Sequence, residues 1–132
     1  MLGKLLAESA GKRTLRRVLS TDPPTVEVNF DETGTILGAA ASGSGTYTSS
    51  VEADGTLHGS GQGFLSTQDG EMVTWTGSGI GRIKEGGAVS YRGALFYKTR
   101  SQKLAALNNA IGVFEHEVDA EGKTQSKSWE WK

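Results

Sequence analysis

The sequence contains no cysteine, which excludes disulfide frameworks, thiolate metal sites and Cys-x-x-Cys redox chemistry. An excess of one charge is also lacking. The formal net charge is −1, which argues against nucleic acid or an anionic membrane as a partner. No apolar run is long enough to span a bilayer or to form the core of a signal peptide. These absences predict a soluble, cytoplasmic protein.

Proline is scarce, with two residues, whereas glycine is abundant. Nineteen of the 132 residues are glycine, which is about twice the usual share. Disordered chains of biased composition are typically rich in both residues, so glycine without proline indicates a folded structure. The length predicts one domain over 1–132 with a single hydrophobic core.

Turn signals recur along the chain. Most place glycine after an acidic or polar residue, and this glycine supplies the positive φ that tight hairpins need. They lie at 21–24, 31–34, 52–55, 68–70, 84–87 and 119–122. The segments between them are rich in Thr, Val and aromatic residues, which favour strands. This pattern predicts eight strands, at 12–20, 25–31, 35–51, 55–67, 71–83, 88–99, 110–118 and 123–131.

Two segments depart from the strand pattern. "SQKLAALNN", at 101–109, has good helix formers and ends in asparagines, which predicts a short helix between the sixth and seventh strands. At the N-terminus, Leu2, Leu5 and Leu6 predict a short amphipathic helix or a flexible arm over 1–11.

Eight sequential strands with short connections leave a sandwich or a closed barrel. Several of the predicted strands are longer than is usual in a sandwich. Long strands in a small barrel must coil strongly, and glycines within a strand permit that bending. The sequence therefore predicts an all-β fold, an eight-stranded antiparallel up-and-down barrel.

The motif GSG occurs three times, at 43–45, 59–61 and 77–79, each inside a predicted strand. Glycines two positions apart share one face of a strand, so each motif leaves a bare stripe. The motifs are not a dinucleotide fingerprint. Counting from Gly77, the third glycine of GxGxxG would fall at Arg82, and no helix follows. We interpret the stripes as structural, and as a way to open space inside the barrel.

"WTGSGIGRIKEGG", which follows "DGTLHGSGQGFLSTQDGE", resembles the central meander of the allene-oxide-cyclase-like β-barrels, a calycin-like superfamily. It is also similar to uncharacterised bacterial families of that class. The resemblance covers residues 45–95 and implies a barrel that forms dimers or trimers. It implies no catalytic residue, because the superfamily includes cyclising enzymes, proteins that steer a coupling reaction and many members of unknown role.

Aromatic residues are the first candidates for a ligand site. Trp75, Tyr91, Tyr97 and Phe64 would be rigid walls with occasional polar tips, as in an apolar ligand pocket. Packing in the core explains the same residues equally well.

Arg92 and Glu115 are the charged candidates. An inward Arg92 would be a buried cation able to hold a carboxylate or enolate, but the alternative face, with Tyr91 and Tyr97, is more apolar and favours an outward Arg92. A partly buried Glu115 would have a raised pKa and could act as a general acid or base. Alternatively, it pairs across strands with Lys127 or Arg92 near the rim.

The sequence gives little support for a nucleophilic serine or a metal site. No serine lies in a GxSxG context, and no zinc-protease motif is present. His58 and His116 are interpreted as solvent-facing or singly hydrogen-bonded rather than as metal ligands, so no metal and no cofactor are predicted.

Three functions remain open. The first is a barrel that binds a small apolar or amphipathic molecule in its cavity. The second is an enzyme of the same architecture that cyclises or isomerises its substrate mainly by shaping it. The third is a filled barrel that acts as a structural or interaction module. The volume of the interior separates the third from the other two.

Overall fold

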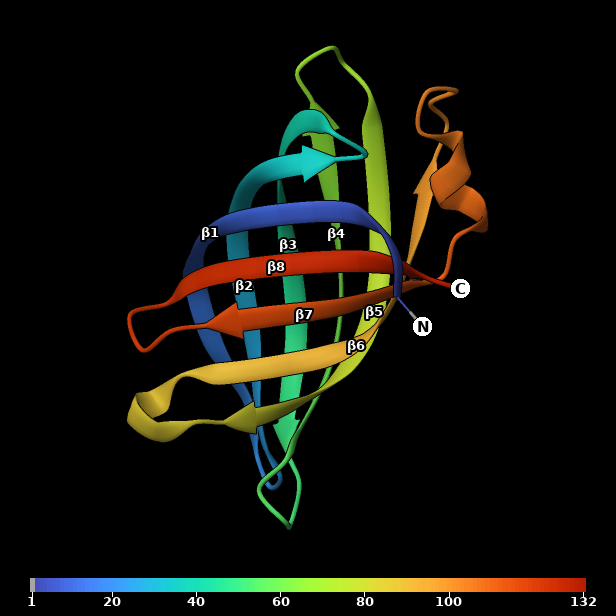
Figure 1. The fold of residues 1–132 in the computed structure, drawn as a ribbon. Helices are drawn as coiled ribbons and strands as arrows, with labels where there is room; N and C mark the ends of the chain where they lie inside the picture. The colour runs from blue at the N-terminus through green and yellow to red at the C-terminus, as the bar shows by residue number, and fades with distance from the viewer. Residues whose placement is uncertain (1) are drawn as a thin grey trace.

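In the computed structural model, which describes residues 2–132, eight strands form one closed barrel (Figure 1). Each strand pairs antiparallel with the next in the chain, and β8 pairs with β1 to close the sheet. The up-and-down barrel predicted from the sequence is confirmed. The strands are β1 (Leu2–Thr21), β2 (Pro24–Ile36), β3 (Ala39–Val51), β4 (Leu57–Thr67), β5 (Met72–Ile83), β6 (Val89–Thr99), β7 (Gly112–Val118) and β8 (Lys123–Trp131).

The N-terminal prediction is wrong. Residues 2–11 form neither a helix nor a loose arm but the first half of β1, which pairs with β2 on one side and β8 on the other. Leu6 is 2% exposed and points into the core, whereas Leu2 and Leu5 are exposed. The spacing that suggested an amphipathic helix therefore arises in a strand with register shifts near Leu5.

The turn predicted at 31–34 is also wrong, because β2 continues through it to Ile36. The hairpin turn lies at Leu37 and Gly38, which both have positive φ, as a two-residue turn of this kind requires. Gly34 instead allows a close approach between strands. A Cβ at this position would lie 1.9 Å from the backbone oxygen of Glu8.

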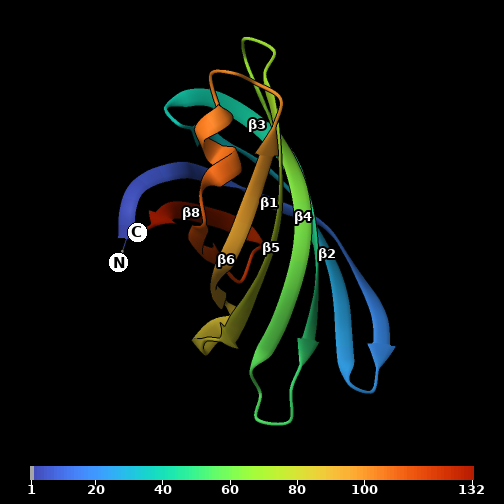
Figure 2. The ribbon, with the colours of Figure 1, turned by 90° about the vertical axis from the view of Figure 1, so that its right-hand side faces the viewer.

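The segment predicted as a helix at 101–109 contains one short 3₁₀ helix, Ala105–Asn109, and a second single turn covers Glu85–Gly87. Leu104, Leu107 and Ala110 are buried against the inward side chains of strand ends. That cluster also contains Leu6, Ile36, Ala41, Leu65, Val73 and Tyr97. The 3₁₀ segment therefore closes one end of the barrel, and Figure 2 shows it against the end of β6.

Between residues 2 and 132, no helix has the length and apolar character needed to cross a membrane.

Candidate functional site in the barrel interior

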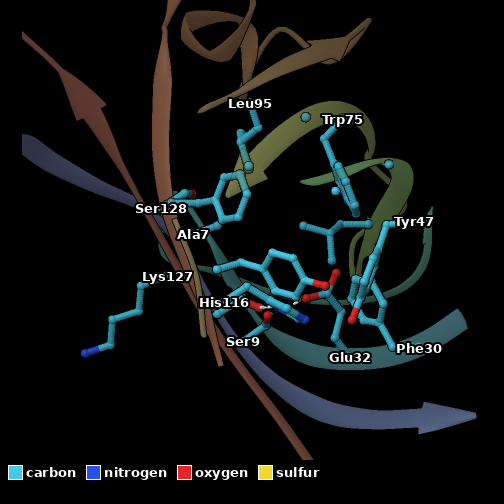
Figure 3. Close-up of a pocket in the computed structure, with 18 of the residues that line it drawn as sticks. Ala7, Ser9, Phe30, Glu32, Tyr47, Trp75, Leu95, His116, Lys127 and Ser128 are labelled. Carbon is cyan, nitrogen blue, oxygen red and sulfur yellow. Dashed lines mark hydrogen bonds between the residues drawn. The ribbon is translucent and has the colours of Figure 1, made fainter. Parts of the chain in front are cut away.

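The inward side chains leave a cavity of about 100 Å³ inside the barrel. Its wall is mainly apolar or glycine, with a few polar groups, as Figure 3 shows. Its principal side chains come from all eight strands: Ala7, Ser9, Phe30, Glu32, Tyr47, Leu65, Trp75, Tyr91, Leu95, Tyr97, Phe114, His116, Ser126 and Ser128. The interior is therefore neither fully packed nor wide open.

Aromatic rings occupy much of the space that the glycine stripes leave. A Cβ on Gly63 would lie 2.6 Å from the Trp75 ring, and a Cβ on Gly45 would lie 2.6 Å from Phe30 and 2.7 Å from Trp75. On β5, a Cβ on Gly81 would lie 2.5 Å from the Tyr91 ring. These rings therefore pack directly against the glycines, where a larger side chain would collide with them.

Four rings form a cluster on one side of the cavity. Phe30 lies 5.2 Å from the His116 ring and 6.0 Å from Tyr47, measured between centroids. Tyr47 is edge-on to Tyr91 at 5.5 Å and to His116 at 5.8 Å. Edge-on and tilted pairs at these distances are favourable, so the cluster is a rigid wall.

Two tyrosine hydroxyls are satisfied within the protein. Tyr91 hydrogen-bonds Ser49 at 2.6 Å, and Tyr97 hydrogen-bonds Ser128 at 2.7 Å. Burial raises the pKa of Tyr97 to about 12 and also raises the pKa of Tyr91. Both phenols therefore stay protonated at neutral pH and act as neutral hydrogen-bonding groups.

Glu32 is a buried acid in the cavity wall, 8% exposed. Its carboxyl group accepts a hydrogen bond from the Ser9 hydroxyl. Burial raises the pKa of Glu32, and the Ser9 hydrogen bond offsets part of that rise. No basic side chain forms a salt bridge with Glu32 in the described part of the chain.

His116 is the second buried titratable group, also 8% exposed. Its Nδ1 is 2.5 Å from the Ser126 hydroxyl, but its Nε2 has no hydrogen-bond partner among residues 2–132. Burial lowers the pKa of His116 to about 4, so the ring is neutral at pH 7. It therefore retains one unused hydrogen-bonding nitrogen.

Strand register brings these polar groups to one level of the barrel. Ser9 on β1 lies opposite Ser126 on β8, which lies opposite His116 on β7, which lies opposite Tyr91 on β6. Glu32 joins this row through its hydrogen bond from Ser9. The cavity therefore has one polar level within a mainly apolar wall.

The structure separates the predicted site residues into two groups. Trp75, Tyr91 and Tyr97 line the cavity. The other three, Phe64, Arg92 and Glu115, lie outside it: Phe64 is 43% exposed, and Arg92 is 3.5 Å from Glu115 on the outer face. The cavity therefore does not include these three predicted residues, and the cross-strand pair between Arg92 and Glu115 is the arrangement observed.

Several residues of the site, Glu32 and His116 among them, were not among the predicted site residues. Glu32 lay in the wrongly predicted turn at 31–34, although Phe30, Glu32 and Gly34 alternate as strand residues do. His116 is singly hydrogen-bonded, which was one of its two interpretations, whereas His58 is exposed beside Glu52. The apolar alternation of Phe114 and Val118 around His116 is the signal that its side chain turns inward.

Residues 2–132 contain no cluster of three or more His, Cys, Asp or Glu side chains that would suit a metal ion. The chemistry available inside the barrel is therefore that of a neutral imidazole, a carboxyl group of raised pKa and several hydroxyl groups. These groups can hydrogen-bond a guest, and they can exchange protons with it.

The fold and the cavity define a class: a small up-and-down β-barrel with a largely apolar interior site. The fold is shared by several solved structures. A protein of unknown function from Clostridium acetobutylicum has a TM-score of 0.82 at 13% identity, with 96% of both chains covered. A barrel-like protein from Acinetobacter baumannii has a TM-score of 0.81 at 13% identity, covering 98% of this chain and 94% of that one.

A third is an enzyme from Penicillium herquei, with a TM-score of 0.67 at 17% identity, covering 98% of this chain and 96% of that one. No protein-family model and no curated protein matches the sequence. Similarity at these identities shows the fold alone.

Proposed function

We propose that this protein binds a small, mainly apolar molecule inside its barrel. The observation that carries the proposal is the cavity of about 100 Å³, with apolar walls and one polar level. Concave sites of this composition are typical of small-molecule binding. An interior packed only for stability would have filled this space, because protein cores rarely leave voids much larger than a water molecule.

The volume limits the ligand. A cavity of ~150 Å³ lined by apolar side chains takes up benzene, so about 100 Å³ limits the ligand to at most one ring or a short chain. Larger guests would require the aromatic wall to move. Fatty acids and polycyclic compounds are therefore excluded from the unaltered cavity.

The direct test is native mass spectrometry on freshly purified protein, followed by soaking with single-ring compounds. A co-purified mass, or a Trp75 fluorescence change on soaking, is the expected result, since Trp75 forms part of the wall. Ala7→Leu adds volume to the cavity wall and should reduce occupancy. Thr76→Leu, on the exposed face of β5, is the control and should leave binding unchanged. Failure to retain any small molecule would reject the proposal.

A second candidate, an enzyme that cyclises or isomerises its substrate, is favoured by one observation. Glu32 and His116 are two titratable groups in the wall of one cavity, with pKa values moved in opposite directions by burial. The Penicillium enzyme adds that this type of barrel can carry catalysis. Once a ligand is identified, incubation with it should give a product that Glu32→Gln does not give. An unchanged ligand would leave binding as the function.

We also propose that the chain belongs to the allene-oxide-cyclase-like barrels, acts in the cytoplasm and associates as a dimer or trimer. The up-and-down order of its strands supports the first point. Exposed apolar side chains on the outer face of β4, β5 and β6 support association: Phe64, Ile80 and Phe96. Light scattering coupled to gel filtration tests it, and a constant monomer mass at high concentration would contradict it.

A further inference from the structure

We propose that the cavity selects an uncharged, single-ring molecule that carries a hydroxyl group, and that His116 Nε2 is the anchor for this hydroxyl. This inference rests on the proposed binding function and specifies its ligand.

The anchor follows from the unpartnered nitrogen. His116 is 8% exposed, and its Nε2 has no hydrogen-bond partner within residues 2–132, although Nδ1 is bonded to Ser126. Buried polar atoms are nearly always hydrogen-bonded, and an exception calls for an explanation such as an absent guest. A purely apolar ligand would keep this nitrogen unpaired, so a polar group on the ligand is favoured.

The hydrogen-bonding groups in the row of Ser9, Ser126 and His116 indicate a hydroxyl group on the ligand. A neutral imidazole offers a donor at one nitrogen and an acceptor at the other, according to its tautomer. A hydroxyl group donates and accepts, so it can pair with Nε2 in either tautomer. It can also hydrogen-bond the Glu32 carboxyl, which accepts from Ser9 in the same row. A carbonyl group, which only accepts, satisfies one tautomer alone.

The charged residues near the cavity wall indicate that the ligand is uncharged. Lys127 borders the cavity, but Figure 3 shows its side chain pointing away, and its ammonium group lies 3.5 Å from Glu8 on the outer face. No other Lys or Arg is among the lining residues, so a carboxylate ligand would meet Glu32 without a counter-charge. A cationic ligand would require an ionised Glu32, which its burial disfavours.

The aromatic side chains in the cavity wall indicate that the ligand contains a ring. Phe30 lies 6.4 Å from Trp75 and 5.2 Å from His116, measured between centroids, so an aromatic wall runs from the apolar side of the cavity to the anchor. A flat guest can stack or lie edge-on against such a wall. The cavity volume of about 100 Å³ allows at most one ring.

Four single-ring probes test the proposal: phenol, toluene, benzoate and benzylammonium. Titration of isotope-labelled protein followed by NMR gives their dissociation constants. Phenol is expected to bind at least about tenfold more tightly than toluene, because only phenol satisfies Nε2, and more tightly than either charged probe. The largest shifts are expected at the row of His116, Ser126 and Ser9.

His116→Phe keeps a ring in the aromatic cluster and removes the anchor, so phenol should lose its advantage over toluene. His58→Phe is the matched control, since His58 is exposed on the outer face, and it should keep the preference for phenol. If His116→Phe does not fold, His116→Gln serves in its place. It retains a hydrogen-bonding end and should keep part of the preference.

Equal binding of phenol and toluene by the unaltered protein would overturn the inference and leave the binding function intact. So would a preference that survives in His116→Phe, or tighter binding of benzoate or benzylammonium. If no probe binds while a co-purified molecule is found, the inference alone fails. If no probe binds and no molecule co-purifies, the binding function fails with it.

Discussion

Burial of His116 links the stability of the barrel to pH. The ordinary pKa of histidine is about 6.5, and burial lowers the pKa of His116 to about 4 in the folded protein. Between these values the unfolded chain binds a proton that the folded protein does not, so folding stability falls as the pH falls. The carboxylate of Glu117 works against this shift, and burial outweighs it.

We predict that acidification from pH 7 to 5 removes about 2 kcal/mol of stability through His116, in urea unfolding followed by circular dichroism. Glu32 acts in the opposite sense, because its raised pKa favours the folded state as the carboxyl group protonates. The measurement is therefore the difference between the unaltered protein and His116→Phe. The same pH dependence in both would show that His116 is not buried as a neutral ring.

The aromatic wall depends on individual glycines. A Cβ on Gly45 would meet the rings of Phe30 and Trp75 at 2.6 and 2.7 Å, too close for these rigid side chains to accommodate. Gly45→Ala is expected to cost about 1–3 kcal/mol in urea unfolding and to alter the fluorescence of Trp75. Gly59→Ala, whose nearest neighbour would be Tyr91 at 3.2 Å, is the milder comparison. Equal stabilities would contradict this account of the stripe.

The 3₁₀ segment is an element whose role is to close the barrel end. Leu107 is fully buried there, with 0% exposure, against a cluster that contains Ile36 and Val73. Leu107→Ala is expected to destabilise the protein by about 2–5 kcal/mol, through lost burial and the cavity left behind. Leu15→Ala, the same change at a 57% exposed position on β1, is the control and should have little effect on stability. Thermal unfolding of both variants measures the difference. A small cost at Leu107 would mean that the segment is not part of the core.

The 3₁₀ segment also shows how much of the structure a local sequence pattern predicts. Its helix formers and terminal asparagines predicted a short helix, and a 3₁₀ turn forms there. At the N-terminus, a similar leucine spacing predicted a helix, yet pairing with two neighbouring strands holds residues 2–11 extended. Backbone hydrogen bonds to β2 and β8 outweigh a weak helical preference. These strands lie outside the short stretch of sequence from which the helix was predicted.

Closure of the barrel removes all sheet edges, so every strand is hydrogen-bonded on both sides. Lys127 lies in β8, opposite Glu8 on β1 and Glu115 on β7. Lys127→Pro should therefore cost about 3 kcal/mol or more, because proline removes a ladder donor and is tolerated only at sheet edges. Far-ultraviolet circular dichroism and urea unfolding measure the loss.

Lys127→Ala is the control for that variant. It removes the same exposed side chain and its 3.5 Å ion pair with Glu8, which should change stability by no more than about 0.5 kcal/mol. A proline variant as stable as the alanine variant would show that the β1–β8 seam is open in solution.

Turn chemistry and alternation along the chain predict the eight strands, their meandering order and some of the aromatic residues that face inward, because these are local properties. Trp75, Tyr91 and Tyr97 could be proposed as wall residues for that reason. The polar level of the cavity is different in kind. It requires Ser9, Ser126 and His116 to align across three strands and Glu32 on β2 to reach the Ser9 hydroxyl, and register between distant segments determines this. The environment of a buried polar group is set by neighbours that are remote in the chain. Only the tertiary structure therefore shows that Nε2 of His116 has no hydrogen-bond partner within residues 2–132.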